Sequence, residues 1–426
     1  MAIALMTPRK FNAHPFAYHQ QLDLRIEKLT NEGSGLARVS NDLVSEWVVF
    51  IPFALPGELV RVQVFRNHKN YSEADLIEVL EPAPDRIPVV CPLFGKCGGC
   101  QYQHLRYDTQ LEWKRRQVQE LLLHMGKTDF SVEPVVPSPR QYGYRSKITP
   151  HFHRPKDGHI GEIGFLRAHT RNAMIDVQHC PIAMDDLNHQ LTIAREEVRN
   201  GRRVYKHGAT ILLRSASGQV LTHPHDLAKE EVSGTHFEFQ AGDFFQNNPF
   251  ILPTFVEHVI AEAIGTGASH LIDAYCGSGL FGLCAAKHFK NVSGVEVSET
   301  AVIKARHNAE LNGLTNCAFI AADAERIFEG ITQPAGDTVI VIDPPRAGCS
   351  EGFLRQLFVF RPRGVVYVSC NPPTQMRDLA LFRESGYELK RVRPFDLFPQ
   401  TKHLECVMTL LPQPSTNAGI DFASAA

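Results

Sequence analysis

Short runs of alternating hydrophobic and polar residues, separated by turns, occupy the first part of the chain. Such runs are typical of half-buried strands, and glycine or proline residues mark the turns between them. We therefore predict a small, OB-like β-barrel over residues 18–82, a fold that commonly binds oligonucleotides. The predicted strands are residues 24–27, 48–52, 59–64 and 74–79, with turns at residues 33–35 and 56–58.

Residues 83–240 show a mixed pattern, which predicts an α+β middle domain. A proline-punctuated connector comes first, and apolar residues then recur at helical spacing over residues 110–125. We expect the whole helix to lie within residues 106–126 and to pack on the domain that follows. A strand over residues 210–215 and a helix over residues 184–199 are also expected.

From residue 241 to residue 413 the pattern changes to strands that alternate with helices, which predicts a doubly wound α/β sheet. Residues 414–426 have the composition of an unstructured tail. The predicted strands are 271–274, 293–297, 317–321, 338–343, 364–369 and 405–410, and the predicted helices are 281–287 and 299–312.

The composition is that of a globular chain without membrane spans. Hydrophobic residues make up 43% and charged residues 21% of the 426 residues, and no apolar run is long enough to cross a bilayer. The first ten residues lack an apolar signal, so we expect a cytoplasmic monomer without a membrane partner. In a reducing compartment the ten cysteines would be ligands, nucleophiles or core residues rather than disulfides.

The net charge of −2 predicts no general attraction to nucleic acid. An RNA or DNA partner would need local basic patches, although short basic runs are more often solvated faces. The candidate patches are residues 114–116, 202–203 and 390–393.

A glycine-rich loop follows the first strand of the predicted sheet. Gly277 and Gly279 lie where the chain turns from that strand into a helix, so the backbone there can approach a ligand closely. Glu296 follows about 20 residues later, where an acid can bind ribose hydroxyls. The third glycine of the dinucleotide-binding motif is missing. The loop is similar to that of S-adenosylmethionine-dependent methyltransferases, in which Asp323 would lie near adenine, although both acids could instead cap helices.

Cys370 ends a β-branched run and precedes two prolines, so its thiol is expected at the ligand-binding edge of the sheet. By itself this pattern is more typical of an inert, buried cysteine. A second strand ends in Asp343-Pro344-Pro345-Arg346. Amino-group methyltransferases carry an aromatic residue after a similar Asp-Pro-Pro motif, and the arginine therefore disfavours that reaction.

Cys91, Cys97 and Cys100 lie within one glycine-rich loop, and Cys180 could supply a fourth thiol. Four thiolates suit either structural zinc or an iron-sulfur cluster, and their spacing does not decide between the two. Five residues separate the first two cysteines, which differs from the three-cysteine loop of radical enzymes. The other cysteines show no such grouping and are expected in the core.

The Asp-Pro-Pro-Arg-Ala-Gly and Ser-Cys-Asn-Pro motifs, together with the run Phe-Pro-Gln-Thr-Lys-His-Leu-Glu at residues 398–405, resemble the RNA uracil-5-methyltransferase family. The resemblance covers nearly the whole chain. It implies a TRAM barrel, a [4Fe-4S] cluster on the four cysteines and a Rossmann-like class I methyltransferase domain. The residues that it implies for S-adenosylmethionine binding are Gln246, Tyr275, Glu296, Asp323 and Asp343. Pro373 and Leu280 depart from the residues that many relatives carry.

The resemblance also gives Cys370 and Glu405 their roles. A thiolate that adds to C6 of uracil makes C5 nucleophilic, and a carboxylate can then remove the C5 proton. The target base must be unpaired or flipped out of its stack. The barrel and the cluster favour 23S ribosomal RNA as substrate, with transfer RNA as the alternative. A non-catalytic, RNA-binding iron-sulfur scaffold is a further alternative, which the intact Cys370 and Glu405 pair disfavours.

Overall fold

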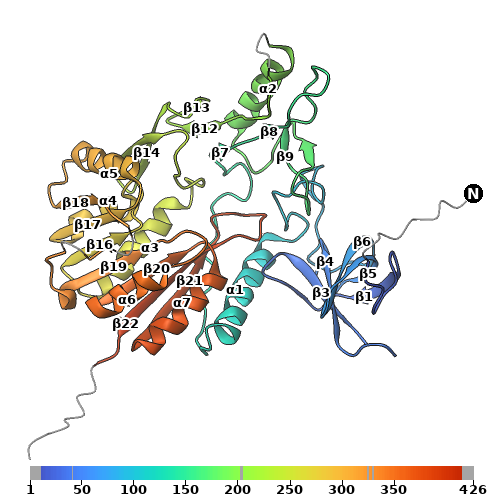
Figure 1. Cartoon of the computed structure of the whole chain (residues 1–426), viewed down its shortest axis with the longest axis horizontal. Coiled ribbons are helices and arrows are strands. Elements are labelled where there is room, and N and C mark those ends of the chain that lie inside the picture. Colours follow the sequence, from blue (N-terminus) through green and yellow to red (C-terminus); the bar gives the residue numbers. More distant parts are fainter. Residues whose placement is uncertain (1–10, 41, 202–204, 324–325, 329–330, 415–426) are drawn as a thin grey trace, which may run out of the picture.

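The computed structural model describes residues 11–40, 42–201, 205–323, 326–328 and 331–414 (Figure 1). A barrel of strands lies at one end and a large sheet flanked by helices at the other, with helix α1 (Tyr107–His124) between them. The candidate basic run 202–203 and all but the first residue of the predicted tail fall outside the described residues.

The N-terminal barrel is a six-stranded sheet in the order β1-β5-β6-β4-β3-β2. Alternate residues of β5 point inward, and Val60, Val62 and Val64 are fully buried, as the alternating pattern predicted. The predicted turn at residues 33–35 was wrong in part, because the chain turns just before Ser34 and then continues as β3. The strands are β1 (Gln21–Arg25), β2 (Lys28–Leu29), β3 (Ser34–Val39), β4 (Trp47–Pro52), β5 (Leu59–Asn67) and β6 (Tyr71–Glu81).

The middle region contains several small sheets and helix α2 (Asp185–Asn200). The strand predicted over residues 210–215 is divided, since β11 pairs with β8 whereas β12 pairs with β7 and β13. The strands are β7 (Lys147–Ile148), β8 (His151–Phe152), β9 (Gly164–Leu166), β10 (Met174–Asp176), β11 (Ala209–Thr210), β12 (Leu213–Ala216), β13 (Gln219–Leu221), β14 (Leu227–Val232) and β15 (Thr235–Gln240).

The C-terminal sheet has seven strands in the order β18-β17-β16-β19-β20-β22-β21. Strand β22 is antiparallel to the other six, which all run in one direction. The pattern predicted β18 and β20 to the residue but missed the last-but-one strand, β21. The strands are β16 (His270–Ala274), β17 (Asn291–Glu296), β18 (Cys317–Ala321), β19 (Thr338–Ile342), β20 (Gly364–Ser369), β21 (Tyr387–Phe395) and β22 (Glu405–Pro412).

Both faces of this sheet are buried, which explains its continuous hydrophobic runs. Val339 and Val341 of β19 belong to one core, while Ile340 and Ile342 of the same strand belong to another. Helices α3 (Leu252–Gly265), α4 (Leu280–Ala285) and α5 (Glu299–Leu311) contribute to the first core, and α6 (Glu351–Phe360) and α7 (Pro372–Glu384) contribute to the second.

Helix α1 joins the second core through Val118 and Leu122, although it precedes the sheet by more than a hundred residues. The helix expected at residues 106–126 therefore does pack on the C-terminal sheet, against α7. In the part of the chain that the structure describes, no helix combines the length and apolarity that a bilayer crossing needs.

Candidate active site

Cys370 and Glu405 meet at one edge of the C-terminal sheet. Cys370 follows β20, and Glu405 begins the antiparallel strand β22. The antiparallel register pairs Ser369 of β20 with Cys406 of β22. Cys370, which follows Ser369, therefore lies beside Glu405, which precedes Cys406. Asp343 follows the adjacent strand β19 and lies at the same edge. Strand pairing thus brings together three residues that lie far apart in the sequence.

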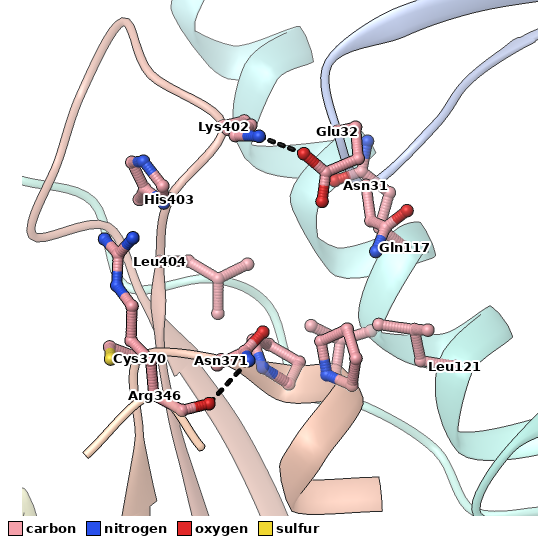
Figure 2. A pocket seen from close by; sticks show the side chains of 13 residues that line it. Asn31, Glu32, Gln117, Leu121, Arg346, Cys370, Asn371, Lys402, His403 and Leu404 are labelled. Atoms are coloured by element: carbon pink, nitrogen blue, oxygen red, sulfur yellow. Dashed lines mark hydrogen bonds and ion pairs between the residues drawn. The ribbon is translucent and has the colours of Figure 1, made fainter. Parts of the chain in front are cut away.

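Figure 2 shows Cys370 in the wall of a cavity of about 330 Å³. Three parts of the chain line this cavity: a turn of the barrel, one face of α1 and the C-terminal sheet edge. The lining residues are Asn31, Glu32, Gln117, Val118, Leu121, Arg346, Cys370, Asn371, Pro372, Pro373, Lys402, His403 and Leu404. The cavity is large enough for a single base.

Burial raises the pKa of all three groups at the sheet edge. The pKa of Cys370 rises to about 11, first through loss of hydration and then through the negative charges of Glu405 and Asp343. Loss of hydration also raises the pKa of Asp343 to about 7. The pKa of Glu405, whose side chain is buried, lies well above its usual value for the same reason and because of Asp343.

Arg346 opposes these shifts, because its positive charge lowers the pKa of both Cys370 and Glu405 and its side chain hydrogen-bonds the thiol. Its backbone is fixed from α7: Asn371 Nδ2 and Thr374 Oγ1 donate to the Arg346 carbonyl at 2.8 and 3.2 Å. Pro372 and Pro373 begin α7 and lack amide hydrogens that would need partners there. The arginine can stabilise a thiolate or the oxygens of a bound base.

The glycine-rich loop forms a separate polar site at the carboxyl ends of β16 and β17. Glu296 accepts hydrogen bonds from the amides of Gly277 at 3.1 Å and Ser298 at 3.0 Å. A Cβ atom on Gly277 would project into open space, and Tyr275 has a φ of 62°, a conformation that residues other than glycine rarely adopt. The loop therefore leaves room for a ligand beside Glu296.

Asp273 lies beneath this loop and is fully buried. Its Oδ2 accepts from the Gly282 amide at 2.7 Å, whereas its Oδ1 has no partner among the described residues. Loss of hydration raises its pKa to about 7. An unpaired buried acceptor is costly, so this site suits a ligand that brings a donor or a positive charge. The sulfonium and amino groups of S-adenosylmethionine fit that requirement.

The remaining predicted cofactor residues come from other segments. Asp323 follows β18 and is exposed at the same end of the sheet as Glu296, whose register partner is Ala321. Gln246 is buried in the segment between β15 and α3. Its neighbour Asn248 anchors that segment, since Asn248 Nδ2 donates to the Leu397 carbonyl at 2.9 Å. The cofactor contacts of Gln246 and Asp323 stay predictions.

The four predicted ligand cysteines line one second cavity of about 360 Å³, although Cys180 is 80 residues beyond the other three. All four thiols are free. The pKa of Cys100 is raised to about 12 and that of Cys180 to about 11, mainly by burial and partly by the neighbouring cysteines. Within the described ranges, no three His, Cys, Asp or Glu side chains form a group arranged to hold a single metal ion.

Two of the candidate basic patches, at residues 114–116 and 390–393, contain cations that form ion pairs within the protein. Lys114 is fully buried and forms an ion pair of 2.7 Å with Asp396, so it cannot contact a phosphate. Its neighbours Arg115 and Arg116 both pair with Glu112. Arg391 pairs with Glu133 and Glu262. Lys114 and Arg391 therefore join segments that are far apart in the sequence, whereas Arg115 and Arg116 pair within α1.

Sequence reasoning also missed the wall of the cavity opposite Cys370. Asn31 and Glu32 come from the barrel and Gln117 from α1, in segments without any motif of their own. Their polar character was visible, but only the packing of three regions places them near Cys370. No pattern local to either segment could have indicated this.

Comparison with known proteins agrees with this geometry. The family model described as tRNA (Uracil-5-)-methyltransferase matches residues 161–413, and that of the TRAM domain matches residues 19–77. The chain belongs to the RNA uracil-5-methyltransferase family. As a member of the family, it is an enzyme that uses S-adenosylmethionine to methylate C5 of uracil in RNA.

Three relatives illustrate the range of this uracil-5-methyltransferase family. The tRNA (uracil(54)-C(5))-methyltransferase of Schizosaccharomyces pombe is 40% identical, over 93% of this chain and 79% of its own length. An uncharacterized RNA methyltransferase of Halalkalibacterium halodurans is 32% identical, over 93% of this chain and 98% of its own length. A solved structure is that of the Pyrococcus abyssi tRNA (uracil-54, C5)-methyltransferase in complex with S-adenosyl-L-homocysteine. It is 23% identical and has a TM-score of 0.70, and the match covers 92% of this chain and 100% of that chain. The last comparison shows a shared fold.

Proposed function

We propose that Cys370 is the nucleophile and Glu405 the base of uracil-5 methylation by this enzyme. The observation that carries the proposal is the strand register, which places these two residues side by side at the sheet edge, next to Asp343. Cys370 and Arg346 line the cavity there. A thiol and a carboxyl group in one desolvated site are the two groups that the reaction requires.

The chemistry assigns a step to each side chain. The Cys370 thiolate, favoured by Arg346, forms a bond to C6 of uracil, and the electron pair of the C5–C6 double bond moves toward C4 and its oxygen. S-adenosylmethionine supplies the methyl group that C5 takes up. Glu405 then accepts the C5 proton, the double bond re-forms and the C6–sulfur bond breaks. For this last step Glu405 must be ionised, which Arg346 also favours.

A covalent trap tests the nucleophile. Fluorine at C5 cannot be removed as a proton, so RNA containing 5-fluorouridine should remain attached to the enzyme in the presence of S-adenosylmethionine. We expect denaturing electrophoresis to show an adduct with the intact enzyme and with Cys317→Ala, a half-buried cysteine of β18. Cys370→Ala should give none while it still binds RNA. An adduct with Cys370→Ala would refute the assignment.

We propose transfer RNA as the substrate, with a uridine equivalent to position 54 as the target. The two relatives named above that carry a target in their names both act on that nucleotide, and one shares the fold over nearly the whole chain. The barrel and the cysteines were expected to favour 23S ribosomal RNA, but a transfer RNA enzyme that shares the fold over 92% of this chain removes the argument from the barrel. Methylation of purified transfer RNA and 23S ribosomal RNA by the enzyme, with mapping of 5-methyluridine, distinguishes the two.

We further propose that Cys91, Cys97, Cys100 and Cys180 hold a [4Fe-4S] cluster. Four thiols around one cavity fit the ligand set. Burial raises the pKa of Cys100 and of Cys180, and a bound positive group would favour their thiolate forms. After anaerobic purification, iron and sulfide should be present and should be lost in Cys180→Ser but retained in Cys317→Ser. Stoichiometric zinc without iron would contradict the proposal.

We also propose that the enzyme is a monomer in the cytoplasm, where the ten thiols would stay reduced. Light scattering of the purified protein gives its mass, and a dimer mass would contradict the first part. Cell fractionation tests the second part.

A further inference from the structure

Lys402 and Glu32 form an ion pair at the cavity. Lys402 lies in the segment between β21 and β22, and Glu32 lies in a turn of the barrel. In Figure 2 this pair lies on the opposite side of the cavity from Cys370 and Arg346. Both residues line the cavity, and the pair spans 370 positions of sequence. Nothing in the proposed chemistry of Cys370 and Glu405 uses either of them.

The barrel side of this pair is held in place. Gln117 Nε2 of α1 donates to the Thr30 carbonyl at 2.8 Å, and the Gly33 amide donates to the same carbonyl at 2.9 Å. Gly33 has a φ of 83°, which closes the turn that carries Glu32. Glu32 therefore meets Lys402 from a fixed turn rather than from a free loop.

The catalytic side is held as well. The Lys402 amide donates to Gln101 Oε1 at 3.1 Å, and the Gln400 carbonyl accepts from the amides of Gln101 and Tyr102 at 3.0 Å each. The Lys402 side chain is 25% exposed and that of Glu32 is 69% exposed. The lysine is thus positioned near the cavity, whereas its carboxylate partner remains largely in water and is easily replaced.

We propose that Lys402 binds an RNA phosphate next to the target uridine, and that Glu32 holds the lysine in place until that phosphate replaces it. Lys402 lines the same cavity as Cys370, so a uridine held there would bring its flanking phosphates toward the lysine. A phosphate carries the same charge as the Glu32 carboxylate and accepts the same hydrogen bonds. An exposed ion pair contributes little stability, so the exchange costs little.

This inference rests on the proposed active site, and it makes opposite predictions for the two residues. Lys402→Ala should weaken binding of a substrate RNA by about fivefold to tenfold. It should also lower the slope of log affinity against log salt by about 0.7, the contribution of one phosphate contact. Glu32→Gln should tighten binding by about twofold to threefold, because a competing carboxylate is removed.

Glu120→Gln is the matched control. Glu120 of α1 pairs with Lys28 of the barrel at 2.9 Å, so this ion pair, like that of Glu32, connects the barrel to another part of the protein. Neither Glu120 nor Lys28 lines the cavity. We expect its affinity and salt slope to equal those of the intact enzyme. Lys402→Arg keeps the positive charge, so it should keep the phosphate contact and the salt slope. This result would show that the effect of Lys402→Ala comes from the lost charge and not from misfolding.

The two proposals fail in different ways. If the intact enzyme forms no adduct with 5-fluorouridine RNA, the proposed active site is wrong. If it forms the adduct but Lys402→Ala keeps the full salt slope, or Glu32→Gln weakens binding as much as Lys402→Ala does, the phosphate exchange is wrong. A change of the same size in Glu120→Gln would also overturn it, because the effect would then belong to the barrel interface in general.

Discussion

Lys114 donates a hydrogen bond of 2.7 Å to Asp396, and the side chains of both residues are fully buried. The same ammonium group donates to the His403 carbonyl at 2.8 Å. One lysine of α1 therefore supports the segment that carries Lys402, His403 and Glu405. This buried contact connects the middle region directly to the catalytic edge of the sheet.

Removing only one member of this pair should destabilise the fold. Lys114→Met leaves Asp396 buried without its cation, and we expect the free energy of unfolding to fall by about 3–5 kcal/mol. Lys114→Met combined with Asp396→Leu should recover most of that loss. Arg115→Met, which breaks an exposed pair with Glu112, should cost no more than about 1 kcal/mol. Urea denaturation measures all three. Equal losses in the single and double variants would contradict the role given to the pair.

Glu405→Gln should separate attachment from release. The amide cannot accept the C5 proton, so methylated RNA should remain bound to Cys370 and the covalent complex should accumulate with ordinary, unfluorinated RNA. We expect turnover to fall by about 100-fold or more, the usual contribution of a general base. Mass spectrometry of the quenched reaction would show the complex. Rapid release with full turnover would assign the base to another residue.

The reactivity of Cys370 should depend on pH and on Arg346. With a pKa of about 11, its thiolate fraction should grow roughly tenfold for each pH unit between 7 and 10. Arg346→Ala removes the group that lowers this pKa, so alkylation of Cys370 at pH 8 should slow by about threefold to tenfold, and Arg346→Lys should restore part of the rate. Peptide mapping after iodoacetamide treatment follows Cys370 alone. An unchanged alkylation rate at pH 8 in Arg346→Ala would exclude this effect.

Asp273 should make the ligand-free enzyme less stable as the pH rises. Its folded-state pKa of about 7 lies above the ordinary value of 3.8, so between these values the folded state holds a proton that the unfolded state has lost. Relative to Asp273→Asn, the intact enzyme should lose about 4 kcal/mol from pH 4 to pH 7 and no more above that. Asp337→Asn is the control of opposite sign, because hydrogen bonds from Ser269 lower the pKa of Asp337. Thermal melting over this pH range checks both.

The sequence alone determined the parts of this protein that depend on local order. Strand β20 was predicted to the residue, because a strand buried on both faces needs an uninterrupted apolar run. The motifs around Asp343, Cys370 and Glu405 indicated the reaction, since each places a required functional group at a strand end. The cysteine spacing indicated a ligand set in the same way.

Only the tertiary structure decided what depends on pairing between distant segments. The antiparallel direction of β22 places Glu405 beside Cys370, and a parallel strand would have put it at the far edge. In the sequence Lys114 belongs to a short basic run. In the structure it is paired with Asp396, which lies 282 residues later. Glu32 belongs to the cavity because α1 holds the barrel against the sheet. A local pattern records which face of an element is buried, but it carries no information on which partner covers that face.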